Sequence, residues 1–350
     1  MEFGIYHEFT SKHGRSDAHA FDLAMDIVDA AEEYGLDVMW LAELHFDPHR
    51  ALLSAPMVVG AAIAGRTERI KIGTSVQVLP LNNPLRLAEE AATLDQVSKG
   101  RLIFGAGRSG VAQTYENYNI PYAESKERFN EALEIIERAW RETGFSHKGK
   151  YYRFDDVTVT PRPYQTPGPE VRVAAASVDT FPVLGQEGRG MFLSVRHEDA
   201  RMFLPNINIY QDEWKKAGHP GKGGVYFRAP GFIASTAAKA REAYEPTLMH
   251  HFRAQAALLA DSCKRLGLSA DNPRWKTVAR LEEITYDEAA RGTVLVGTPD
   301  QVTEQLKALE KDIGLDGIQL EFNCGGLTKH EDERESMRLL CQEVKPAFAS

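Results

Sequence analysis

The chain is poor in the features that mark several large classes of protein. Its 350 residues include three cysteines, Cys263, Cys324 and Cys341, and their scattered spacing fits neither a disulfide framework nor a metal site. Its apolar runs fall well short of the roughly 20 residues that span a bilayer. The N-terminal MEFGIYHEF has no basic stretch before an apolar core, so we predict no signal peptide. Together these absences predict a cytoplasmic protein with reduced thiols.

Basic charge is also scarce. Lysine and arginine number 41 against 50 aspartate and glutamate residues, which leaves a net charge of −9. Such a chain is a poor partner for nucleic acid or for an anionic membrane. The sequence has no GxSxG motif, and around His45, His49 and the His250–His251 pair no third ligand stands at a metal-binding spacing. We therefore expect neither a covalent hydrolase nor a metalloenzyme.

Apolar residues, by contrast, make up 43% of the chain and fall in short runs that alternate with amphipathic segments. This alternation of predicted strands and helices is typical of an α/β fold. We predict a (β/α)8 TIM barrel, with a doubly wound open sheet as the alternative. One domain is expected over residues 1–350, with loop insertions at about 145–168 and 268–293. The predicted strands cover residues 3–6, 38–42, 69–76, 101–105, 171–176, 191–194, 225–234 and 317–322.

The end of the second predicted strand is the expected centre of a site. The apolar run Val38–Ala42 predicts a strand buried on both faces, and the polarity changes at once to Glu43 and His45. Reactive groups of barrels lie where strands end, so Glu43 and His45 are candidate catalytic residues. His7, at the end of the first strand, is a further candidate predicted to face the same mouth. An imidazole moves protons near neutral pH, and a structural histidine bonded to its neighbours is the alternative for both.

A glycine-rich loop follows the fourth predicted strand. The run from Gly105 through Gly107 to Gly110 fits the pattern GxGxxG. A dinucleotide fingerprint lies early in a βαβ unit and leads straight into a helix. Here the following segment, residues 111–122, has no helical stripe, so we expect a loop there and disfavour a Rossmann site.

Four motifs together resemble the bacterial luciferase-like flavin monooxygenases, and their order and spacing agree over nearly the whole chain. The resemblance implies a TIM barrel whose oxygenase activity uses reduced FMN (FMNH2) from a separate NAD(P)H:flavin reductase. It also implies that O2 is activated as a flavin C4a-peroxide and that one oxygen atom enters a small organic substrate. The motifs are MxFG at Met1–Gly4, WLAExHF at Trp40–Phe46, IxIGTxVxVLPxxxPxRxAEExAxLDxxSxGR at Ile70–Arg101 and VGTPxQVxEQL at Val296–Leu306.

The resemblance also implies residues that bind the flavin phosphate. Arg108 and Arg128 match arginines that contact it, and the donor fork of a guanidinium suits phosphate oxygens. Ser177 and Thr180, at the start of a predicted helix, match further phosphate ligands. The alternatives are a surface ion pair for Arg108, a solvated Arg128 and a helix-capping role for Thr180.

Two further positions concern the flavin ring. The Ser75–Val76 peptide matches a non-proline cis bond that supports the ring in the family, although an ordinary trans bond is the general expectation. Ala176 stands where relatives of the luciferase catalytic chain carry a glutamate, so that contact to the ring is lost or replaced.

The main departure from the family is Leu44. Many relatives have two adjacent histidines after the glutamate, and the first is usually given the catalytic role. Leucine cannot carry a proton, so the role is absent or moves to His45. Two other functions stay open, an F420-dependent oxidoreductase and a non-catalytic subunit of a luciferase-like heterodimer. A homodimer is implied by the resemblance, through the predicted helices Pro56–Gly65 and Pro84–Val97.

Overall fold

The computed structural model describes residues 1–10, 16–48, 50–175, 177–194, 199–292 and 294–349. Eight strands of this described chain close into a parallel barrel, because β9 pairs with β10 and β12 pairs with β1. The predicted TIM barrel is therefore confirmed, and the open sheet is excluded. In order around the barrel the strands are β1 (Glu2–His7), β2 (Val38–Leu41), β3 (Lys71–Thr74), β5 (Leu102–Gly107), β8 (Glu170–Ala174), β9 (Gly190–Ser194), β10 (Val225–Ile233) and β12 (Gly317–Glu321).

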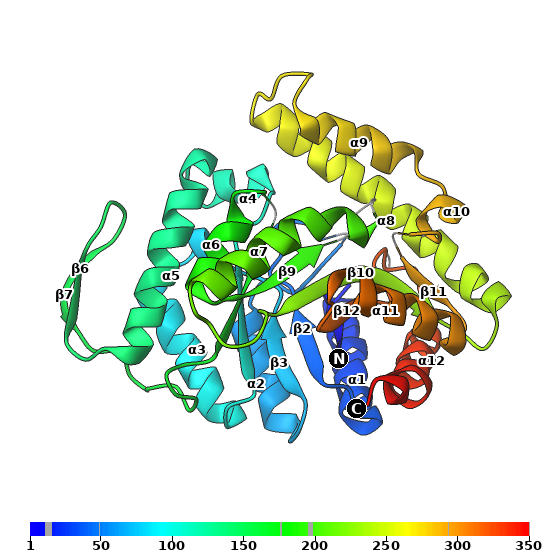
Figure 1. Ribbon diagram of the computed structural model, residues 1–350, viewed down its shortest axis with the longest axis horizontal. Coiled ribbons are helices and arrows are strands. Elements are labelled where there is room, and N and C mark those ends of the chain that lie inside the picture. Colours follow the sequence, from blue (N-terminus) through cyan, green and yellow to red (C-terminus); the bar gives the residue numbers. More distant parts are fainter. Residues whose placement is uncertain (11–15, 49, 176, 195–198, 293, 350) are drawn as a thin grey trace.

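Helices cover the outside of the barrel (Figure 1). Helix α1 shows why the local sequence folds as it does: Ser16 caps its first turn by accepting from the His19 N–H, and Gly35, at φ 86°, ends it. None of the described helices is both long and apolar enough to cross a membrane. The main helices are α1 (Asp17–Tyr34), α2 (Pro56–Arg66), α3 (Pro84–Ser98), α5 (Ser125–Arg141), α6 (Thr180–Glu187), α7 (Leu204–Lys216), α8 (Ala237–Arg265), α11 (Pro299–Ile313) and α12 (His330–Leu339).

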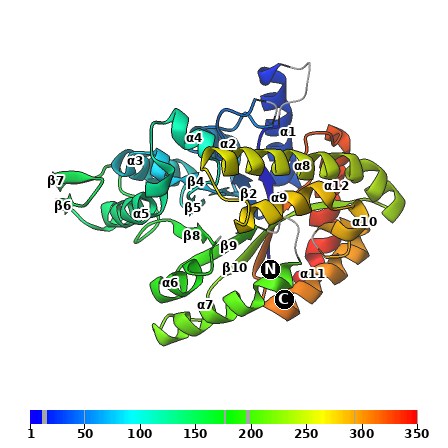
Figure 2. The same cartoon turned by 90° about the horizontal axis from the view of Figure 1, so that it is seen from above.

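Shorter elements decorate the loops. A helix, α4 (Ala112–Asn117), follows β5, so the expectation of a loop there is wrong; six residues are too few to show an apolar stripe. The segment 268–293 holds α9 and α10, and α9 lies beside α8 in both views (Figure 2). The remaining elements are the antiparallel hairpin β6 (Phe145–Lys148) and β7 (Arg153–Val157), the short strands β4 (Gln77–Val78) and β11 (Leu295–Gly297), and the helices α9 (Pro273–Glu283) and α10 (Tyr286–Ala289).

Alternation along β1 decides which side chains enter the barrel. A Cβ on Gly4 would lie 2.5 Å from the Trp40 indole nitrogen, so Gly4 faces the interior and leaves room for that ring. Tyr6 faces the same way, because the Arg228 guanidinium of β10 lies 3.4 Å from the centre of its ring. Successive residues of a strand point to opposite faces. Glu8 therefore continues the inward row, whereas His7 points out towards the helices.

Candidate active site at the barrel mouth

Glu43 anchors the backbone that follows β3. Its Oε2 accepts from the Val78 N–H at 2.5 Å and from the Gln77 amide, and its Oε1 faces His45 Nε2 at 3.0 Å and Asn82 Nδ2 at 3.4 Å. Each of these contacts comes from a group that can donate, so the carboxylate oxygens act as acceptors. Glu43, which is buried, thus ties the end of β2 to the segment after β3. Within that segment the Ser75–Val76 peptide is cis, as the resemblance implies.

The two glycines of β5 lie directly behind this segment. A Cβ on Gly105 would come within 1.8 Å of the Thr74 carbonyl oxygen, and one on Gly107 within 2.2 Å of Val76 Cγ2. Thr74 Oγ1 also bonds the Gly105 backbone, donating to its carbonyl at 2.7 Å and accepting from its N–H at 2.9 Å. Close approach of two backbones thus accounts for the glycines without a dinucleotide.

The structure brings the predicted residues Glu43 and His45 together. While Nε2 of His45 contacts Glu43, its Nδ1 lies 3.3 Å from the Tyr118 hydroxyl oxygen at the end of α4. The imidazole packs edge-on against the Tyr118 ring, at 5.2 Å between centroids, and lies beside Phe46 at 5.8 Å. Its side chain is only 8% exposed. Both ring nitrogens of His45 therefore have a partner.

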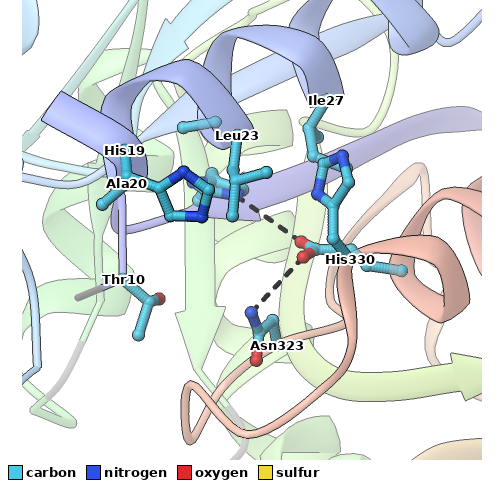
Figure 3. A pocket seen from close by; sticks show the side chains of 10 residues that line it. Thr10, His19, Ala20, Leu23, Ile27, Asn323 and His330 are labelled. Atoms are coloured by element: carbon cyan, nitrogen blue, oxygen red, sulfur yellow. Dashed lines mark hydrogen bonds and ion pairs between the residues drawn. The ribbon is translucent and has the colours of Figure 1, made fainter. Parts of the chain in front are cut away.

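His7 does not face the mouth, so that expectation is wrong. Its Nδ1 accepts from the Phe9 N–H at 3.0 Å, and its Nε2 lies 3.5 Å from Glu333 Oε1 on α12. The physical reason is the alternation of β1, which sends Tyr6 and Glu8 inwards. His7 instead lines a groove between α1 and α12. Figure 3 labels seven further residues of this groove, Thr10, His19, Ala20, Leu23, Ile27, Asn323 and His330.

Several predicted phosphate ligands gather where α5 and α6 begin. An Arg108 guanidinium nitrogen lies 3.5 Å from the Ser125 hydroxyl at the start of α5, and none of the carboxylates that the structure describes pairs with Arg108. The hydroxyls of Ser177 and Thr180, 2.9 Å apart, stand at the start of α6. Lys126 of α5 forms an ion pair with Asp179 just before α6, which connects the two helix starts.

Arg128 is placed differently from Arg108. Its Nε donates to Glu124 Oε2 at 2.8 Å, and its guanidinium lies 4.3 Å from the centre of the Tyr151 ring. The Arg128 charge therefore already has a carboxylate and a π-face as partners. Ala176 lies outside the described residues.

Sequence reasoning missed a buried ionic network across the mouth from these arginines. Glu8 accepts from Arg50 Nε at 2.9 Å and from Arg228 at 3.4 Å, and Arg228 also donates to Glu321 at 2.7 Å. Burial alone raises the pKa of Glu8, but the Arg50 charge outweighs it and lowers that pKa to about 2. Two carboxylates thus balance two guanidinium groups. The only local signs were the inward positions of β1 and the single charges of Arg228 and Glu321 within mainly apolar strands, and neither sign indicates a partner.

Helix α8 crosses the mouth and forms one of its walls. Midway along α8, His251 Nδ1 lies 2.8 Å from the Cys324 carbonyl oxygen, in the loop after β12. In the last turn of α8, Ser262 accepts from the Ala112 N–H of α4 at 3.3 Å. The helix thus joins loops that follow strands on opposite sides of the barrel. Within the described chain, no cluster of three or more histidine, cysteine, aspartate or glutamate side chains is arranged to hold a metal ion.

Comparison with known protein families identifies the family of this chain. Residues 1–317 match the profile of the family described as luciferase-like monooxygenase. The chain belongs to this family. The predicted family is therefore confirmed. At the level of the family, the prediction of a flavin-dependent monooxygenase is confirmed as well.

Among curated relatives of this luciferase-like protein are two named oxygenases. The alkanal monooxygenase alpha chain of the Kryptophanaron alfredi symbiont is 26% identical over 92% of this chain and 91% of its own length. The oxygenase component of the flavin-dependent trigonelline monooxygenase of Acinetobacter baylyi is 23% identical over 100% and 96%. An F420-dependent glucose-6-phosphate dehydrogenase of Kineococcus radiotolerans is 35% identical, but over only 47% of this chain and 50% of its own.

Solved structures agree with the fold. The monooxygenase RslO1 of Streptomyces bottropensis superposes with a TM-score of 0.81, at 25% identity and with both chains covered completely. The oxygenating constituent of 3,6-diketocamphane monooxygenase of Pseudomonas putida, solved in complex with FMN, also reaches 0.81, at 23% identity over 99% and 98% of the two chains.

Proposed function

We propose that this protein is the oxygenase component of a two-component monooxygenase. It binds reduced FMN supplied by a separate NAD(P)H:flavin reductase and, with O2, inserts one oxygen atom into a small organic substrate. The observation that carries the proposal is the gathering of Arg108, Ser177 and Thr180 at two adjoining helix starts. The names of the relatives, one of which is an oxygenase component, support the division between oxygenase and reductase.

The residues at the helix starts fit a phosphate group. Free backbone N–H groups at a helix start and hydroxyl donors form an anion site, and Arg108 adds a guanidinium that has no competing carboxylate among the described residues. Ser125, which is buried, contributes another hydroxyl beside Arg108. Arg128 fits less well, since a phosphate has to displace Glu124 from it. We therefore propose Arg108, Ser177 and Thr180 as the main phosphate ligands, with Arg128 secondary.

The backbone beside this anion site fits a flat ring. Ser75 and Val76 form a platform backed by β5, where a side chain on Gly107 would collide with Val76 and one on Gly105 with Thr74, directly before the platform. Glu43 fixes the far end of the platform through Val78. The buried Gln77 Oε1 has no hydrogen-bond partner in the part of the chain described, which leaves an acceptor next to the platform. We propose that the flavin ring lies against Ser75–Val76.

Reduced flavin, when bound, supplies the electrons that activate O2 for transfer of one oxygen atom. The chain's own residues orient and protect this chemistry. Glu43 holds the His45 imidazole at Nε2, and His45 Nδ1 is the atom at which a proton is held or released. Helix α8 and the short helix α4 cover the mouth and restrict the access of water.

The substitution Arg108→Ala tests the anion site directly. Removing a charge-assisted partner of the phosphate is expected to weaken FMN binding about 10- to 100-fold. Riboflavin, which lacks the phosphate, is expected to bind wild type and variant equally, and Arg153→Ala, on the exposed face of β7, serves as the matched control. Dissociation constants are measured by equilibrium dialysis and, for reduced FMN, by anaerobic fluorescence titration. An unchanged FMN affinity in Arg108→Ala contradicts the assignment.

F420-dependent hydride transfer is the second candidate, because an F420-dependent relative matches half of the chain. The two functions separate in one experiment. With the protein in excess over reduced FMN, the rate at which O2 oxidises the flavin is expected to differ from that of free reduced FMN, whereas reduction of F420 with no effect on reduced FMN supports the alternative. Turnover by this chain alone also argues against a non-catalytic subunit.

Assembly and location belong to the same proposal. We propose a homodimer formed through α2 and α3, each of which presents an exposed valine: Val58 is 71% exposed and Val97 is 48% exposed. The three cysteines are buried and free, which supports a reducing compartment such as the cytoplasm.

A further inference from the structure

A continuous chain of three side chains runs from the platform to the surface. Glu43 is buried at the inner end, with 7% of its surface exposed, and the His45 side chain follows with 8%. Tyr118, at the outer end, is 40% exposed. The polar atoms along this path lie 3.0 Å and 3.3 Å apart.

The direction of each hydrogen bond follows from the partners. The Glu43 carboxylate already accepts from Val78 and Gln77, so it also accepts from His45, and the ring proton lies on Nε2. Nδ1 of His45 then presents a lone pair. The Tyr118 hydroxyl is the donor to that lone pair, and partial burial raises the pKa of Tyr118, which keeps its proton in place.

The surrounding rings hold this arrangement. Phe46 adopts φ 61°, a left-handed conformation that a bulky residue rarely takes, and its ring is 52% exposed beside His45. It lies 5.5 Å from the Tyr118 ring, so the three rings contact one another in pairs. Strained backbone of this kind persists where the surroundings determine it, often at functional sites.

We infer that Tyr118 is a positioning residue that fixes the His45 tautomer and connects His45 to solvent as a proton relay. The inference rests on the proposed function and deepens it, because His45 is the proton-carrying side chain of that proposal and its neighbour Leu44 cannot carry a proton. In the relay, the Tyr118 hydroxyl passes its proton to His45 Nδ1 as it takes one from a solvent hydronium ion, which leaves as water, so Tyr118 stays protonated throughout. The resulting imidazolium stays paired with Glu43, and the reverse transfer restores the neutral ring.

The first test needs no flavin. Tyr118→Phe keeps the ring contacts but removes the hydroxyl, so the His45 Nδ1 loses its only donor among the described residues. In ¹⁵N-histidine NMR spectra, assigned with His45→Asn, the Nδ1 resonance is expected to move towards the position of an imidazole nitrogen without a hydrogen bond, while Nε2 keeps its proton. The matched control is Tyr164→Phe, an exposed tyrosine beside Gly100, just before β5 begins, which leaves the spectrum unchanged.

The second test measures the reaction. With protein in excess over reduced FMN, so that little free flavin reacts, O2 consumption is expected to be about fivefold to tenfold slower in Tyr118→Phe, as loss of one hydrogen bond implies. The solvent deuterium isotope effect is expected to change with it, since a purely structural role would leave that effect untouched. Tyr164→Phe again serves as the control and is expected to match wild type in both measurements.

The outcomes separate the relay from the proposed function. A shifted Nδ1 resonance together with a slower rate and an altered isotope effect supports the relay. An identical Nδ1 resonance, or a shifted resonance with wild-type kinetics, overturns it while the proposed function stands. Wild-type protein that consumes no O2 with reduced FMN overturns the proposed function and the relay together, and the NMR spectrum then reports a structural contact alone.

Discussion

Among single residues, Glu8 connects the two buried arginines of the mouth. It accepts from both Arg50 and Arg228, and it is only 4% exposed. Removing one member of a buried ionic group leaves the charges of its partners uncompensated. The resulting loss of folding free energy is larger than the net stabilisation that the intact pair contributes. The stability of the whole network therefore depends on the ionised form of this one carboxylate.

The substitution Glu8→Gln is expected to lower the free energy of unfolding by about 3–5 kcal/mol at pH 7. Urea denaturation of wild type and variant measures the difference. Glu245→Gln, which removes an exposed partner of Arg241 on α8, is the matched control and is expected to change stability little. Equal losses in the two variants contradict a special role for the buried network.

The same carboxylate predicts a pH dependence. The pKa of Glu8 falls from its ordinary 4.5 to about 2 in the folded protein, so its contribution is complete above about pH 4.5 and is lost as the pH falls towards 2. The stability difference between wild type and Glu8→Gln is therefore expected to shrink between pH 4.5 and pH 2. A difference that stays constant over this range contradicts the lowered pKa.

At the scale of single residues, the sequence predicted site residues correctly where the polarity along the chain changes abruptly. Glu43 and His45 follow an uninterrupted apolar strand, and they do meet in space. His7 was expected at the mouth because strand ends were considered without the alternation along the strand. Arg228 and Glu321 are single charges within apolar strands, and their contact joins positions 93 residues apart, so nothing local pointed to the pair.

At the scale of elements, α8 holds the loop after β12 in place. Thr247 Oγ1, fully buried, accepts from the N–H groups of Gly325 and Leu327, each at 3.1 Å. A Cβ on Gly325 would come within 2.1 Å of the Thr247 carbonyl oxygen, so the loop lies directly on the helix. The wall of the mouth therefore depends on this contact.

Thr247→Val keeps the shape of the side chain but removes the acceptor from two partly buried N–H groups. We expect the free energy of unfolding to fall by about 1–3 kcal/mol, because two donors lose their partner. Thermal and urea unfolding measure it, with Thr93→Val on the exposed face of α3 as the control, where the hydroxyl bonds only its own helix. A loss no larger than that of the control contradicts the proposed docking.

Element boundaries were predictable where local chemistry marks them. The expected helix Pro84–Val97 is found as Pro84–Ser98, since Asn83 caps its start and Lys99, at φ 55°, ends it. The strands of the barrel also lie where short apolar runs predicted them. Helix α4 was not predicted, because its single turn and a half depends on contacts with α8 that lie about 150 residues away in the sequence.

For the whole molecule, the closed barrel follows from the regular alternation of strands and helices, but assembly does not. The proposed dimer depends on Val58 and Val97, apolar side chains exposed on α2 and α3. Single exposed apolar residues are common on monomers. The oligomeric state therefore needs its own measurement.

Val58→Asp places a charge in the proposed interface. Wild type is expected to have twice the mass of the 39.0 kDa chain by light scattering, and Val58→Asp the mass of one chain at the same concentration. Val183→Asp, at a valine of α6 that is 44% exposed, is expected to stay dimeric. A monomeric wild type, or a dimeric Val58→Asp, contradicts the assignment of this surface.

The neutral pairing of Arg50 and Arg228 with Glu8 and Glu321 bears on what compounds the mouth admits. On that side of the barrel, the guanidinium groups that the structure describes are already committed to carboxylates. Organic acids therefore gain little attraction there, and screening for turnover is best begun with uncharged compounds. Conversely, Glu321→Gln is a starting point for engineering an enzyme that accepts organic acids, because it removes one of the two carboxylates that pair with Arg228.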